Sequence, residues 1–588
     1  MSAQKLLQGA IDAALANFDV SGVAPETLHV VPASNPQFGD YQWNGALPLA
    51  KSLKQKPRDI AQSVLQKLDV REICEPPEIA GPGFLNLRLK TSWLESALAR
   101  ALSDDRLGVA PVAQAQKYVV DFSSPNVAKP MHVGHIRSTI IGDAIVRILR
   151  FMGHEVVSDN HIGDWGTAFG KIIVGWKSEL DETALAADPI AEMERLYKLI
   201  NDQGKINPAV EDAARQETAK LQAGDSQNLA IWERVRELSQ QQFDAIYGRL
   251  DVSFDETLGE SFYNPRLPSL VDELVAQGLA RESDGAIAIF SDGVGDPKND
   301  PFLIFKDGEW ADFPALIRKS DGASLYATTD LATLEHRIQT WHPDEIIYVT
   351  DARQAGHFRQ LFAAFRRWMP ENPVRLSHVA FGMILGEDKT PLKTREGGSV
   401  KLAALLDEAQ ERALATVREK NSDLSDQATE HIAQVVGIDA VKYADLSQNR
   451  ASDYVFSWDK MLSLNGNSAA YMLYAYARVR SIFRKAEAEG IEATVVDPTL
   501  DEPTEVELGK VLLRFDEVLA ASLRDYRLNV LTDYLYELSG AFSAFYRDCR
   551  VLDAPAEVRA SRLALGDLTA RTLQKGLSLL GIQTLEQM

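Results

Sequence analysis

Apolar positions in the middle of the chain repeat first at strand spacing and then at helix spacing. A short apolar run at 118–120 leads into a polar loop that ends at His132. From Ile136 to Met152 apolar residues recur every three or four positions, which predicts an amphipathic helix. Gly153 suits the end of that helix, and the residues after it predict a second strand. Strand, helix and strand in this order predict a right-handed βαβ unit and hence a parallel sheet.

Strand patterns return later, after a long polar stretch. Apolar runs at 345–349 and 378–385 predict two further strands. Before them, residues 175–310 are charged and mainly helical in pattern, with a strand-like stretch at 286–290. We therefore expect one α/β domain over residues 115–400 that carries an insertion at about 175–310.

The two ends of the chain show other patterns. Residues 1–110 mix helix patterns with short strand-like runs, which predicts a separate α+β domain. From residue 401 the pattern is helical, and we divide it into a connecting region over 401–455 and an all-α bundle over 456–588. The acidic run from Asp497 to Glu507 contains two prolines and predicts a solvated loop. The expected fold class is multidomain α/β, with a parallel Rossmann-like domain between an α+β domain and an all-α bundle.

Composition narrows the class of protein. With 588 residues, 45% hydrophobic and 25% charged, the chain has the profile of a globular protein of several domains. Cys74 and Cys549 lie far apart and predict neither a disulfide framework nor a metal cluster. Without a secretory N-terminal pattern or an apolar run of membrane-span length, we expect a cytoplasmic protein with no membrane partner. The formal charge of −22 argues against DNA as a partner, although a local basic face can still bind RNA.

Two histidines and a glycine stand where the first predicted helix begins. They are His132, Gly134 and His135. A helix N-terminus presents free backbone N–H groups and partial positive charge, which suit a phosphate group. Gly134 leaves room for a ligand, and imidazoles can donate hydrogen bonds to phosphate oxygens. The pattern favours a phosphate-binding helix start, and the alternative is two histidines that only cap a helix.

Six segments spread over the chain carry a more specific signal. They are SSPNVAKPMHVGH at 123–135, HIGDWGTAFG at 161–170, KSDGASLYATTDLA at 319–332, VTDARQAGHF at 349–358, GNSAAYMLYAYARVRSI at 466–482 and PQFGDYQWNGAL at 36–47. Together they resemble the arginyl-tRNA synthetase family, which belongs to the class I aminoacyl-tRNA synthetases. The first segment is similar to that family's form of the class I signature, and the resemblance covers nearly the whole chain.

The resemblance implies a ligase that activates L-arginine with ATP and transfers the arginine to the 3′ end of tRNA(Arg). Mg²⁺ would come with ATP, without a dedicated site on the protein. The C-terminal bundle would bind the anticodon region, the N-terminal domain would contact the tRNA elbow, and the enzyme would be a monomer. By the same resemblance His132 and His135 act in catalysis and contact ATP, with Gly134 and Met383 in the same ATP site.

A pocket for arginine needs a carboxylate, because a guanidinium is planar and always charged. Asp330 lies four residues after Tyr326, so a helix would place both on one face. Gln354 follows a predicted strand at its carboxyl end, where parallel sheets bind ligands. The alternatives are an ordinary helix start and a solvated loop residue. The resemblance assigns seven residues to the arginine site: Ser124, Pro125, Asn126, His135, Tyr326, Asp330 and Gln354.

Class I synthetases usually carry a second signature, Lys-Met-Ser-Lys, which this chain lacks. The corresponding segment is KTPLKTREGG at 389–398, whose Lys393 and Arg395 are candidates for binding the leaving pyrophosphate. Glu396 is an unfavourable neighbour for phosphate, so a solvated charged turn is the alternative. Lys129 lies three residues before His132 and is the candidate that supplies the missing charge to ATP and to catalysis.

Basic and aromatic residues interleave at the start of the C-terminal bundle, which suits unstacked anticodon-loop bases. The alternative is that the tyrosines belong to the core and the arginines to a solvated face. Residues 541–552 are a second candidate face for RNA. The candidate tRNA contacts are Tyr471, Arg478 and Arg480 in the bundle, and Phe38, Tyr41 and Asn44 in the N-terminal domain.

Three rival functions fit parts of the pattern. A cysteine-specific synthetase of the same class binds its substrate thiol through zinc, which two distant cysteines cannot hold. A tRNA-binding relative without catalytic activity would not need His132, Gly134 and His135 intact. A nicotinamide-dependent enzyme would show Gly-x-Gly-x-x-Gly after the first strand, where this chain has none.

Overall fold

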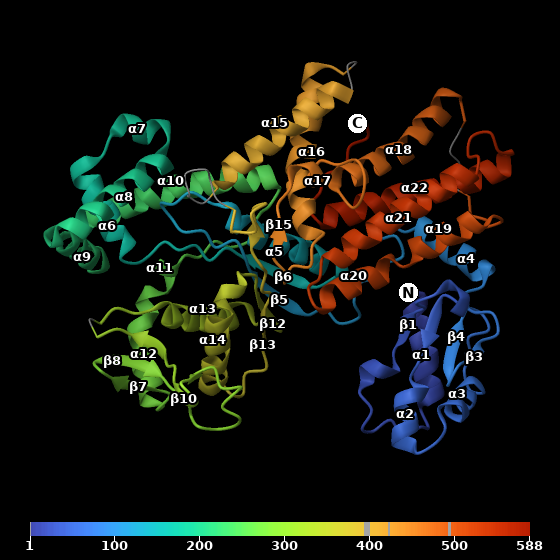
Figure 1. Cartoon of the computed structure of the whole chain (residues 1–588), viewed down its shortest axis with the longest axis horizontal. Coiled ribbons are helices and arrows are strands. Elements are labelled where there is room, and N and C mark those ends of the chain that lie inside the picture. Colours follow the sequence, from blue (N-terminus) through green and yellow to red (C-terminus); the bar gives the residue numbers. More distant parts are fainter. Residues whose placement is uncertain (1, 321, 393–399, 421–423, 492–495, 588) are drawn as a thin grey trace. The chain divides into compact units, whose positions relative to one another are not determined.

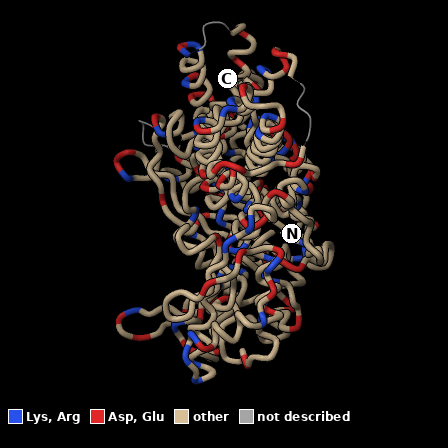
Figure 2. The backbone as a smooth tube through the Cα atoms, turned by 90° about the vertical axis from the view of Figure 1, so that its right-hand side faces the viewer, with Lys and Arg blue, Asp and Glu red and all other residues tan. Residues whose placement is uncertain are grey.

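The computed structural model describes residues 2–320, 322–392, 400–420, 424–491 and 496–587 (Figure 1). The backbone divides into two compact units, one of residues 113–462 and one that joins the residues before 113 to those after 462. Lysine and arginine lie interspersed with aspartate and glutamate over much of the backbone (Figure 2). No helix in the described parts is long and apolar enough to cross a membrane.

A four-stranded parallel sheet with the order β13-β12-β5-β6 forms the centre of the unit of residues 113–462. Its strands are β5 (Lys117–Asp121), β6 (Glu155–Asp159), β12 (Glu345–Tyr348) and β13 (Arg375–His378). Tyr118 of β5 lies beside Glu345 on one side and Val156 on the other. The sheet confirms the predicted Rossmann-like class. Because all four strands run the same way, their carboxyl ends share one edge.

Helix α5 (Val133–Met152) connects β5 to β6, as the apolar stripe predicts. Most of its side chains are buried, since the helix packs between the sheet and helices α15 and α16. Gly153 ends it with a φ of 93°, a backbone conformation that costs glycine little. The start of α5 therefore lies at the carboxyl edge of the sheet, directly after β5.

The strand predicted at 378–385 is wrong in its bounds. β13 ends at His378, and the chain is extended again only in β14 (Ile384–Leu385), which pairs with β15 (Tyr454–Val455). The residues between are apolar because a loop covers them. The N–H of Gly382 donates to the carbonyl of Arg450, and a Cβ on Gly382 would lie 2.5 Å from the backbone of that loop. Burial under a loop produces the same apolar pattern as burial in a sheet.

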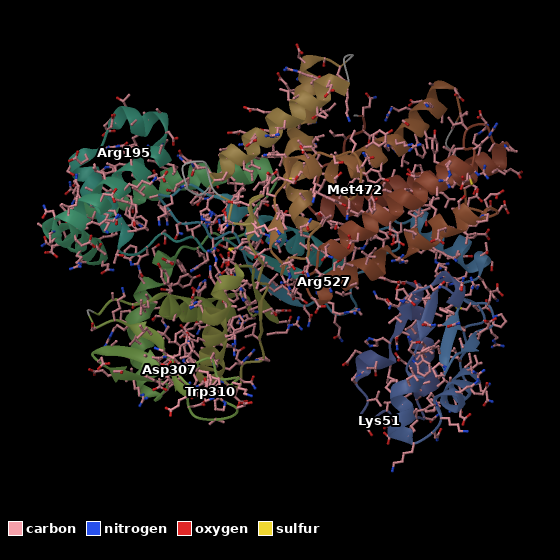
Figure 3. All side chains as sticks on the ribbon, viewed as in Figure 1. Lys51, Arg195, Asp307, Trp310, Met472 and Arg527 are labelled. Atoms are coloured by element: carbon pink, nitrogen blue, oxygen red, sulfur yellow. The ribbon has the colours of Figure 1, made fainter. Side chains whose placement is uncertain are left out.

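The segment between β6 and β12 holds a group of helices followed by small antiparallel sheets. The helices are α6 (Ala168–Glu179), α7 (Glu182–Ala187), α8 (Pro189–Ile206), α9 (Pro208–Gln222), α10 (Ser226–Leu250), α11 (Glu260–Tyr263), α12 (Leu267–Ala276) and α13 (Tyr326–Trp341). The strands are β7 (Ala280–Ser283), β8 (Ala286–Ile289), β9 (Leu303–Lys306), β10 (Glu309–Asp312) and β11 (Ala315–Arg318). Asp307 and Trp310 mark the β9–β10 hairpin (Figure 3). The unit ends with α14 (Ala355–Trp368), α15 (Leu402–Lys420), α16 (Asp426–Leu446) and α17 (Trp458–Met461).

The second unit combines an antiparallel sheet, β1-β2-β4-β3, with two groups of helices. Its strands are β1 (Val30–Pro32), β2 (Tyr41–Trp43), β3 (Glu78–Ala80) and β4 (Phe84–Leu87). The N-terminal helices are α1 (Ala3–Leu15), α2 (Ala46–Leu53), α3 (Pro57–Leu65) and α4 (Thr91–Leu102). The C-terminal helices are α18 (Ala469–Ala488), α19 (Pro503–Leu513), α20 (Phe515–Arg524), α21 (Asn529–Asp548) and α22 (Ala556–Leu579). These elements agree with the predicted α+β and all-α patterns.

The acidic run at 497–507 is a loop only up to Glu502. Pro503 is the first residue of α19, where its missing N–H costs nothing. Glu505 is buried and its carboxylate accepts from Arg562 at 2.7 Å, while its other oxygen accepts the N–H of Glu502. The prediction of a loop through Glu507 is wrong because the charge belongs to a capping box and a buried ion pair.

Tyr41 is buried in β2, which corrects the prediction that it contacts tRNA. Only 4% of the residue is exposed. Its hydroxyl donates to the carboxylate of Glu517 on α20, with the two oxygens at 2.9 and 3.0 Å. The same carboxylate also accepts the N–H of Gln4. Tyr41 therefore ties the N-terminal sheet to the C-terminal helices, and its side chain is not free for RNA.

Candidate active site

A cavity of about 560 Å³ opens at the carboxyl ends of β5 and β12. Asp121 and Tyr348, the last residues of these strands, lie in its wall. This is the edge at which parallel sheets bind ligands. The predicted site residues that line it are Ser124, Asn126, His132, Gly134, His135, Tyr326, Asp330 and Gln354. Pro125, Lys129 and Met383 do not line it, and Lys393 and Arg395 lie outside the described residues.

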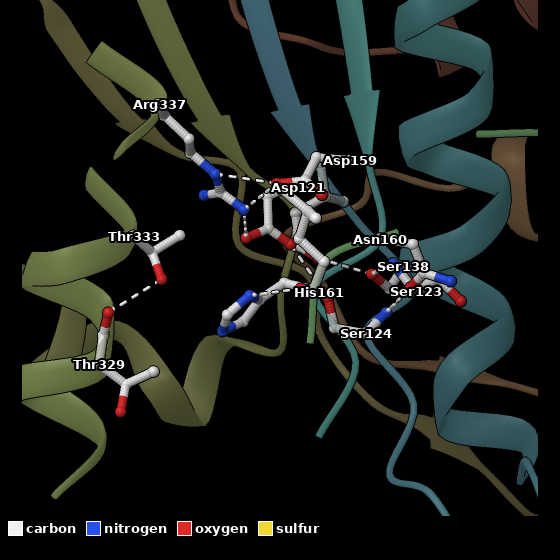
Figure 4. A network of polar contacts seen from close by, with 12 residues as sticks. Asp121, Ser123, Ser124, Ser138, Asp159, Asn160, His161, Thr329, Thr333 and Arg337 are labelled. Carbon is white, nitrogen blue, oxygen red and sulfur yellow. Dashed lines mark hydrogen bonds and ion pairs between the residues drawn. The ribbon is translucent and has the colours of Figure 1, made fainter. Parts of the chain in front are cut away.

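The loop from β5 to α5 has a strained backbone. Ser123, Ser124 and Ala128 have φ values of 73°, 49° and 61°, a region that costs non-glycine residues energy. Polar contacts hold the loop in place (Figure 4): the N–H of Ser124 donates to Oδ1 of Asn160 at 3.1 Å, and the hydroxyl of Ser124 donates to Asp121. The N–H of Ser123 donates to Ser138 of α5 at 2.8 Å. These contacts hold the loop in its strained conformation.

Backbone N–H groups fix the rings of His132 and His135 at the start of α5. The backbone N–H of His132 donates to Nδ1 of His135, and the N–H of Gly134 donates to Nδ1 of His132, both at 3.0 Å. Because each Nδ1 accepts, the proton of each neutral ring sits on Nε2. Burial lowers the pKa of His132, helped by the charges of Arg353 and Lys129, and burial beside His132 lowers the pKa of His135 to about 3. The pair is therefore neutral at physiological pH, with two Nε2–H donors left for a ligand.

Gly134 is required by its neighbour as well as by a ligand. A Cβ at this position would lie 2.8 Å from Cε1 of His132 and 2.9 Å from its Nδ1. Such contacts are closer than real side chains tolerate, so the imidazole would have to move. The glycine thus permits the hydrogen bond that sets the tautomer of His132.

A buried arginine links the ends of two strands (Figure 4). Nη2 of Arg337, on α13, lies 2.7 Å from carboxylate oxygens of both Asp121 and Asp159. Burial raises the pKa of Asp159, and the charge of Arg337 opposes this rise. The two carboxylates raise the pKa of Arg337 well above its ordinary value, although burial lowers it. Within this triad Asp121 lines the cavity and accepts from the hydroxyl of Ser124.

Carboxylates from two elements face the same part of the cavity. Asp330 lies one turn after Tyr326 on α13, and Glu260 is the first residue of α11. Burial, then the negative charges of Asp330 and Asp164, raise the pKa of Glu260 to about 8. Nε2 of His357, on α14, lies 2.6 Å from Oδ2 of Asp330. Such a pocket suits a cationic side chain that can replace protons near the carboxylates.

Sequence reasoning missed several residues of this site. Asp121 follows the first predicted strand and could have been found by the rule that placed Gln354. His357 lies within the segment VTDARQAGHF, three residues after Gln354. Glu260 and Arg337 carry no local signal, because their partners are about seventy residues or more away in the chain. Only folding brings them to the cavity.

Lys129 and Met383 lie near the cavity without lining it. The ammonium of Lys129 sits over the ring of Tyr197, 5.4 Å from its centroid. Its charge still reaches His132, whose pKa it helps to lower. The N–H of Met383 donates to Asp453 at 2.6 Å, and its carbonyl accepts from Tyr454. A contact of Met383 with ATP would therefore use its side chain or a free lone pair of its carbonyl.

The chain that follows residues 393–399 pairs with the first signature. The N–H of Val133 donates to the carbonyl of Val400 at 2.9 Å, and the N–H of Leu402 donates to that of Met131 at 2.8 Å. These bonds fix residues 400–402 beside the histidine pair. In the described parts of the chain, no group of three His, Cys, Asp or Glu side chains is arranged to hold a metal ion.

The other predicted tRNA contacts differ in accessibility. Phe38 is 43% exposed, whereas Asn44 is half-buried. In the C-terminal helices Tyr471 packs against Tyr536, with ring centroids 5.5 Å apart. Arg478 lies over the ring of Tyr546, and Arg480 pairs with Glu586 at 2.9 Å.

Three families match consecutive parts of the chain. Residues 97–458 match the family described as tRNA synthetases class I (R), catalytic domain. Residues 472–588 match the DALR anticodon binding domain, and residues 5–89 match the arginyl tRNA synthetase N terminal domain.

Whole-chain relatives agree with these matches. The chain is 50% identical over 579 residues to the arginine–tRNA ligase of a Nostoc species, covering 95% of each protein. It is 44% identical to that of Hahella chejuensis, covering 100% of both. Among solved structures, arginyl-tRNA synthetase from Plasmodium falciparum has a TM-score of 0.82 at 28% identity, covering 100% of this chain and 98% of that one. The Thermus thermophilus arginyl-tRNA synthetase has a TM-score of 0.81 at 26% identity, covering 100% of both.

Proposed function

This chain belongs to the arginyl-tRNA synthetase family, and from that premise we propose that the cavity at the ends of β5 and β12 binds ATP and arginine side by side. The reaction is that of an arginine–tRNA ligase. The carboxylate of arginine attacks the α-phosphate of ATP, pyrophosphate leaves, and the arginyl group then moves to the 3′ end of tRNA. The enzyme's task in such a transfer is to position the reactants and neutralise developing charge.

The observation that carries the proposal is the neutral histidine pair. Two Nε2–H donors and the N-terminus of α5 face one cavity with the carboxylates of Asp330 and Glu260. Donors of this kind suit phosphate oxygens, and the carboxylates suit a guanidinium. We assign His132, Gly134 and His135 to ATP, with Met383 beside them.

Lys129 is our candidate for charge on the leaving phosphates. It is exposed, and its charge acts on His132. Lys393 and Arg395 remain proposals for the same role. We propose that Mg²⁺ arrives with ATP, because hard phosphate oxygens bind that ion. No step here depends on a metal held by the protein.

The charged and polar residues that line the cavity indicate where arginine would bind. We propose that Asp330 and Glu260 pair with the guanidinium and that Tyr326, which is 70% exposed, covers it. Ser124, Asn126, His135 and Gln354 line the remaining wall and can bind the ammonium and carboxylate of the substrate. Pro125 contributes through its carbonyl, which accepts the N–H of Gly163 and so shapes the wall.

We propose that two domains of the enzyme bind different regions of tRNA. The domain of residues 1–110 contacts the tRNA elbow through Phe38 and Asn44, and residues 456–588 bind the anticodon region of tRNA(Arg) through Tyr471, Arg478 and Arg480; the matched family domains support this. Residues 115–400, with an insertion at about 175–310, form the catalytic domain, and 401–455 connect it to the bundle. We also propose that the enzyme is a cytoplasmic monomer.

Exchange of pyrophosphate into ATP tests the assignment directly. The assay is run with each amino acid in turn, with and without tRNA. We expect exchange with arginine only, and only when tRNA is present. Exchange supported by another amino acid contradicts the substrate, and no exchange under any condition contradicts the activity.

A further inference from the structure

The imidazole of His357 is hydrogen-bonded to the carboxylate of Asp330. Its Nε2 lies 2.6 Å from Oδ2 of Asp330, and the two residues come from the first turn of α14 and the second turn of α13. Both line the cavity, so the imidazole sits where an incoming cation would approach the carboxylate. A hydrogen bond of this length to a carboxylate is of the charge-assisted kind.

The charges around this pair come from every neighbouring element. On α11 stands Glu260, and Asp164, from the loop after β6, is held by Ser261 at 2.7 Å. Arg337 beneath is already shared between Asp121 and Asp159. The remaining titratable groups that line the cavity are His132 and His135 at the start of α5, His161 after β6, Tyr326 on α13, Tyr348 at the end of β12, Asp351 just before η4 (Ala352–Gln354) and Arg353 on η4. His378, at the end of β13, does not line the cavity, but the charge of His357 contributes to the lowering of its pKa. The local excess is negative, and the Asp351–Arg353 pair is internally neutral.

We propose that His357 is a specificity-determining residue of the arginine pocket. Its imidazolium pairs with Asp330 until the guanidinium of the substrate takes its place. When arginine binds, the imidazolium releases its proton and gives up the hydrogen bond to Asp330. This rests on the proposed function, in which Asp330 binds the guanidinium. Arginine brings one permanent charge and five N–H donors to a carboxylate that the imidazolium neutralised before. Two cations on one carboxylate repel, so the proton departs and the ring becomes neutral.

Glu260 should also release a proton when arginine binds. Its pKa of about 8 means that it holds a proton in the empty pocket near neutral pH. The bond to Asp330 raises the pKa of His357, which keeps the imidazole protonated further into the neutral range. A guanidinium beside both groups lowers both pKa values, so up to two protons leave. At pH well above 8 Glu260 has already lost its proton, so fewer protons are released when arginine binds.

The exchange of His357 for the guanidinium also predicts that a neutral analogue is rejected. Citrulline carries a urea in place of the guanidinium and has the same length. Without a charge it cannot expel the imidazolium, so Asp330 stays bound to His357 and the urea N–H groups lack their acceptor. A buried polar group left without its partner weakens binding by roughly 5- to 150-fold.

Calorimetric titration of the full-length enzyme with L-arginine tests the idea. Heats are compared in buffers of different ionisation enthalpy, at pH 7 and pH 9.5, which counts protons released. His357→Gln keeps an amide N–H near Nε2 but cannot carry a proton. We expect the wild type to release more protons at pH 7 than at pH 9.5, and His357→Gln to release fewer protons than the wild type at pH 7. We also expect this variant to discriminate less between arginine and citrulline.

Asp330→Asn separates the two proposals. If it leaves arginine affinity unchanged, the arginine pocket is elsewhere and the proposed site is overturned. If Asp330→Asn abolishes binding while His357→Gln releases as many protons as the wild type, the role of His357 alone is overturned. Absence of any release by the wild type at pH 7 also overturns it, without reference to a variant.

Discussion

Nη2 of Arg337 lies 2.7 Å from a carboxylate oxygen of Asp159, and both side chains are fully buried. The same nitrogen reaches Asp121 on the neighbouring strand. Two carboxylates at the ends of adjacent strands would repel each other without it. The three side chains therefore link β5, β6 and α13, and Asp121 among them also lines the cavity.

Replacement of Arg337 by methionine should destabilise the protein strongly. Breaking a buried ion pair by removing one partner costs about 3–5 kcal/mol, because the charge left behind has no compensation. The measurement is the shift of the urea midpoint of unfolding. Arg234→Met is the matched control: its pair with Glu237 is exposed on both sides, and surface pairs contribute about 0–1 kcal/mol. Equal shifts for the two variants would contradict a special role for Arg337.

Phe38 and Tyr41 should behave in opposite ways. Tyr41→Phe removes a hydrogen bond to the buried carboxylate of Glu517 and should cost about 1.5–3 kcal/mol of stability. It should leave the KM for tRNA unchanged. Phe38→Ala removes an exposed ring and should raise the KM for tRNA, as loss of one stacked base costs about 1–3 kcal/mol. The assays are urea unfolding and aminoacylation; a raised tRNA KM in Tyr41→Phe alone would reverse the assignment.

Lys129→Ala should slow arginine activation far more than it weakens arginine binding. Removal of one group that neutralises transition-state charge typically costs about 10²–10³ in rate. Pyrophosphate exchange gives the rate, and calorimetry gives the affinity for arginine. Lys198→Ala, which removes an exposed lysine paired with Glu194 within α8, is the control. Unchanged turnover in Lys129→Ala would remove this residue from the ATP site.

Gly134→Ala should lower the activation rate without lowering the stability of the protein. The added Cβ would lie 2.8 Å from Cε1 of His132 and displace that ring, so activation should fall. Alanine is a better helix former than glycine by about 1 kcal/mol, so the thermal midpoint should hold or rise slightly. Gly248→Ala in α10, where nothing lies within 4 Å of the new Cβ, should gain stability without loss of activity. A normal activation rate in Gly134→Ala would show that the His132 tautomer does not matter.

His378 should make the protein less stable in acid. Its ring stacks on Phe358 with centroids 4.5 Å apart, and burial, with the charge of Arg450, lowers its pKa to about 4. In the unfolded chain its pKa is about 6.5. Between these values only the unfolded chain binds the proton, so this contribution is complete above about pH 6.5 and is lost as the pH falls toward 4.

The matched variant is His378→Gln, which cannot titrate. The difference in unfolding free energy between the wild type and this variant should shrink from pH 7 to pH 4. Urea unfolding at several pH values measures it. A difference that stays constant across this range would contradict the assignment of the acid sensitivity to His378.

Local sequence patterns were enough to predict the helix and the strands at whose ends the cavity lies. The apolar stripe from Ile136 to Met152, with a glycine after it, specifies α5 because helix periodicity and termination depend on near neighbours. The runs at 118–120 and 345–349 specify strands β5 and β12 for the same reason. Since ligands bind at the carboxyl edge of a parallel sheet, the positions of His132 and Gln354 at the cavity could be predicted as well.

Burial that depends on distant partners could not be predicted this way. The run at 378–385 is apolar because a loop from residue 450 covers part of it, and Tyr41 faces inward to meet Glu517 across the unit. Pro503 begins a helix whose cap is built from acidic side chains.

The sequence by itself determined the class of the fold, the histidine pair and the carboxylate of Asp330, since each rests on residues within a turn or two of one another. Tertiary structure alone decided that His357 meets Asp330, that Glu260 stands nearby and that Arg337 joins two strands. The physical reason is that charge pairing in a buried site depends on distance in space and on desolvation. Neither quantity is encoded in the spacing of residues along the chain.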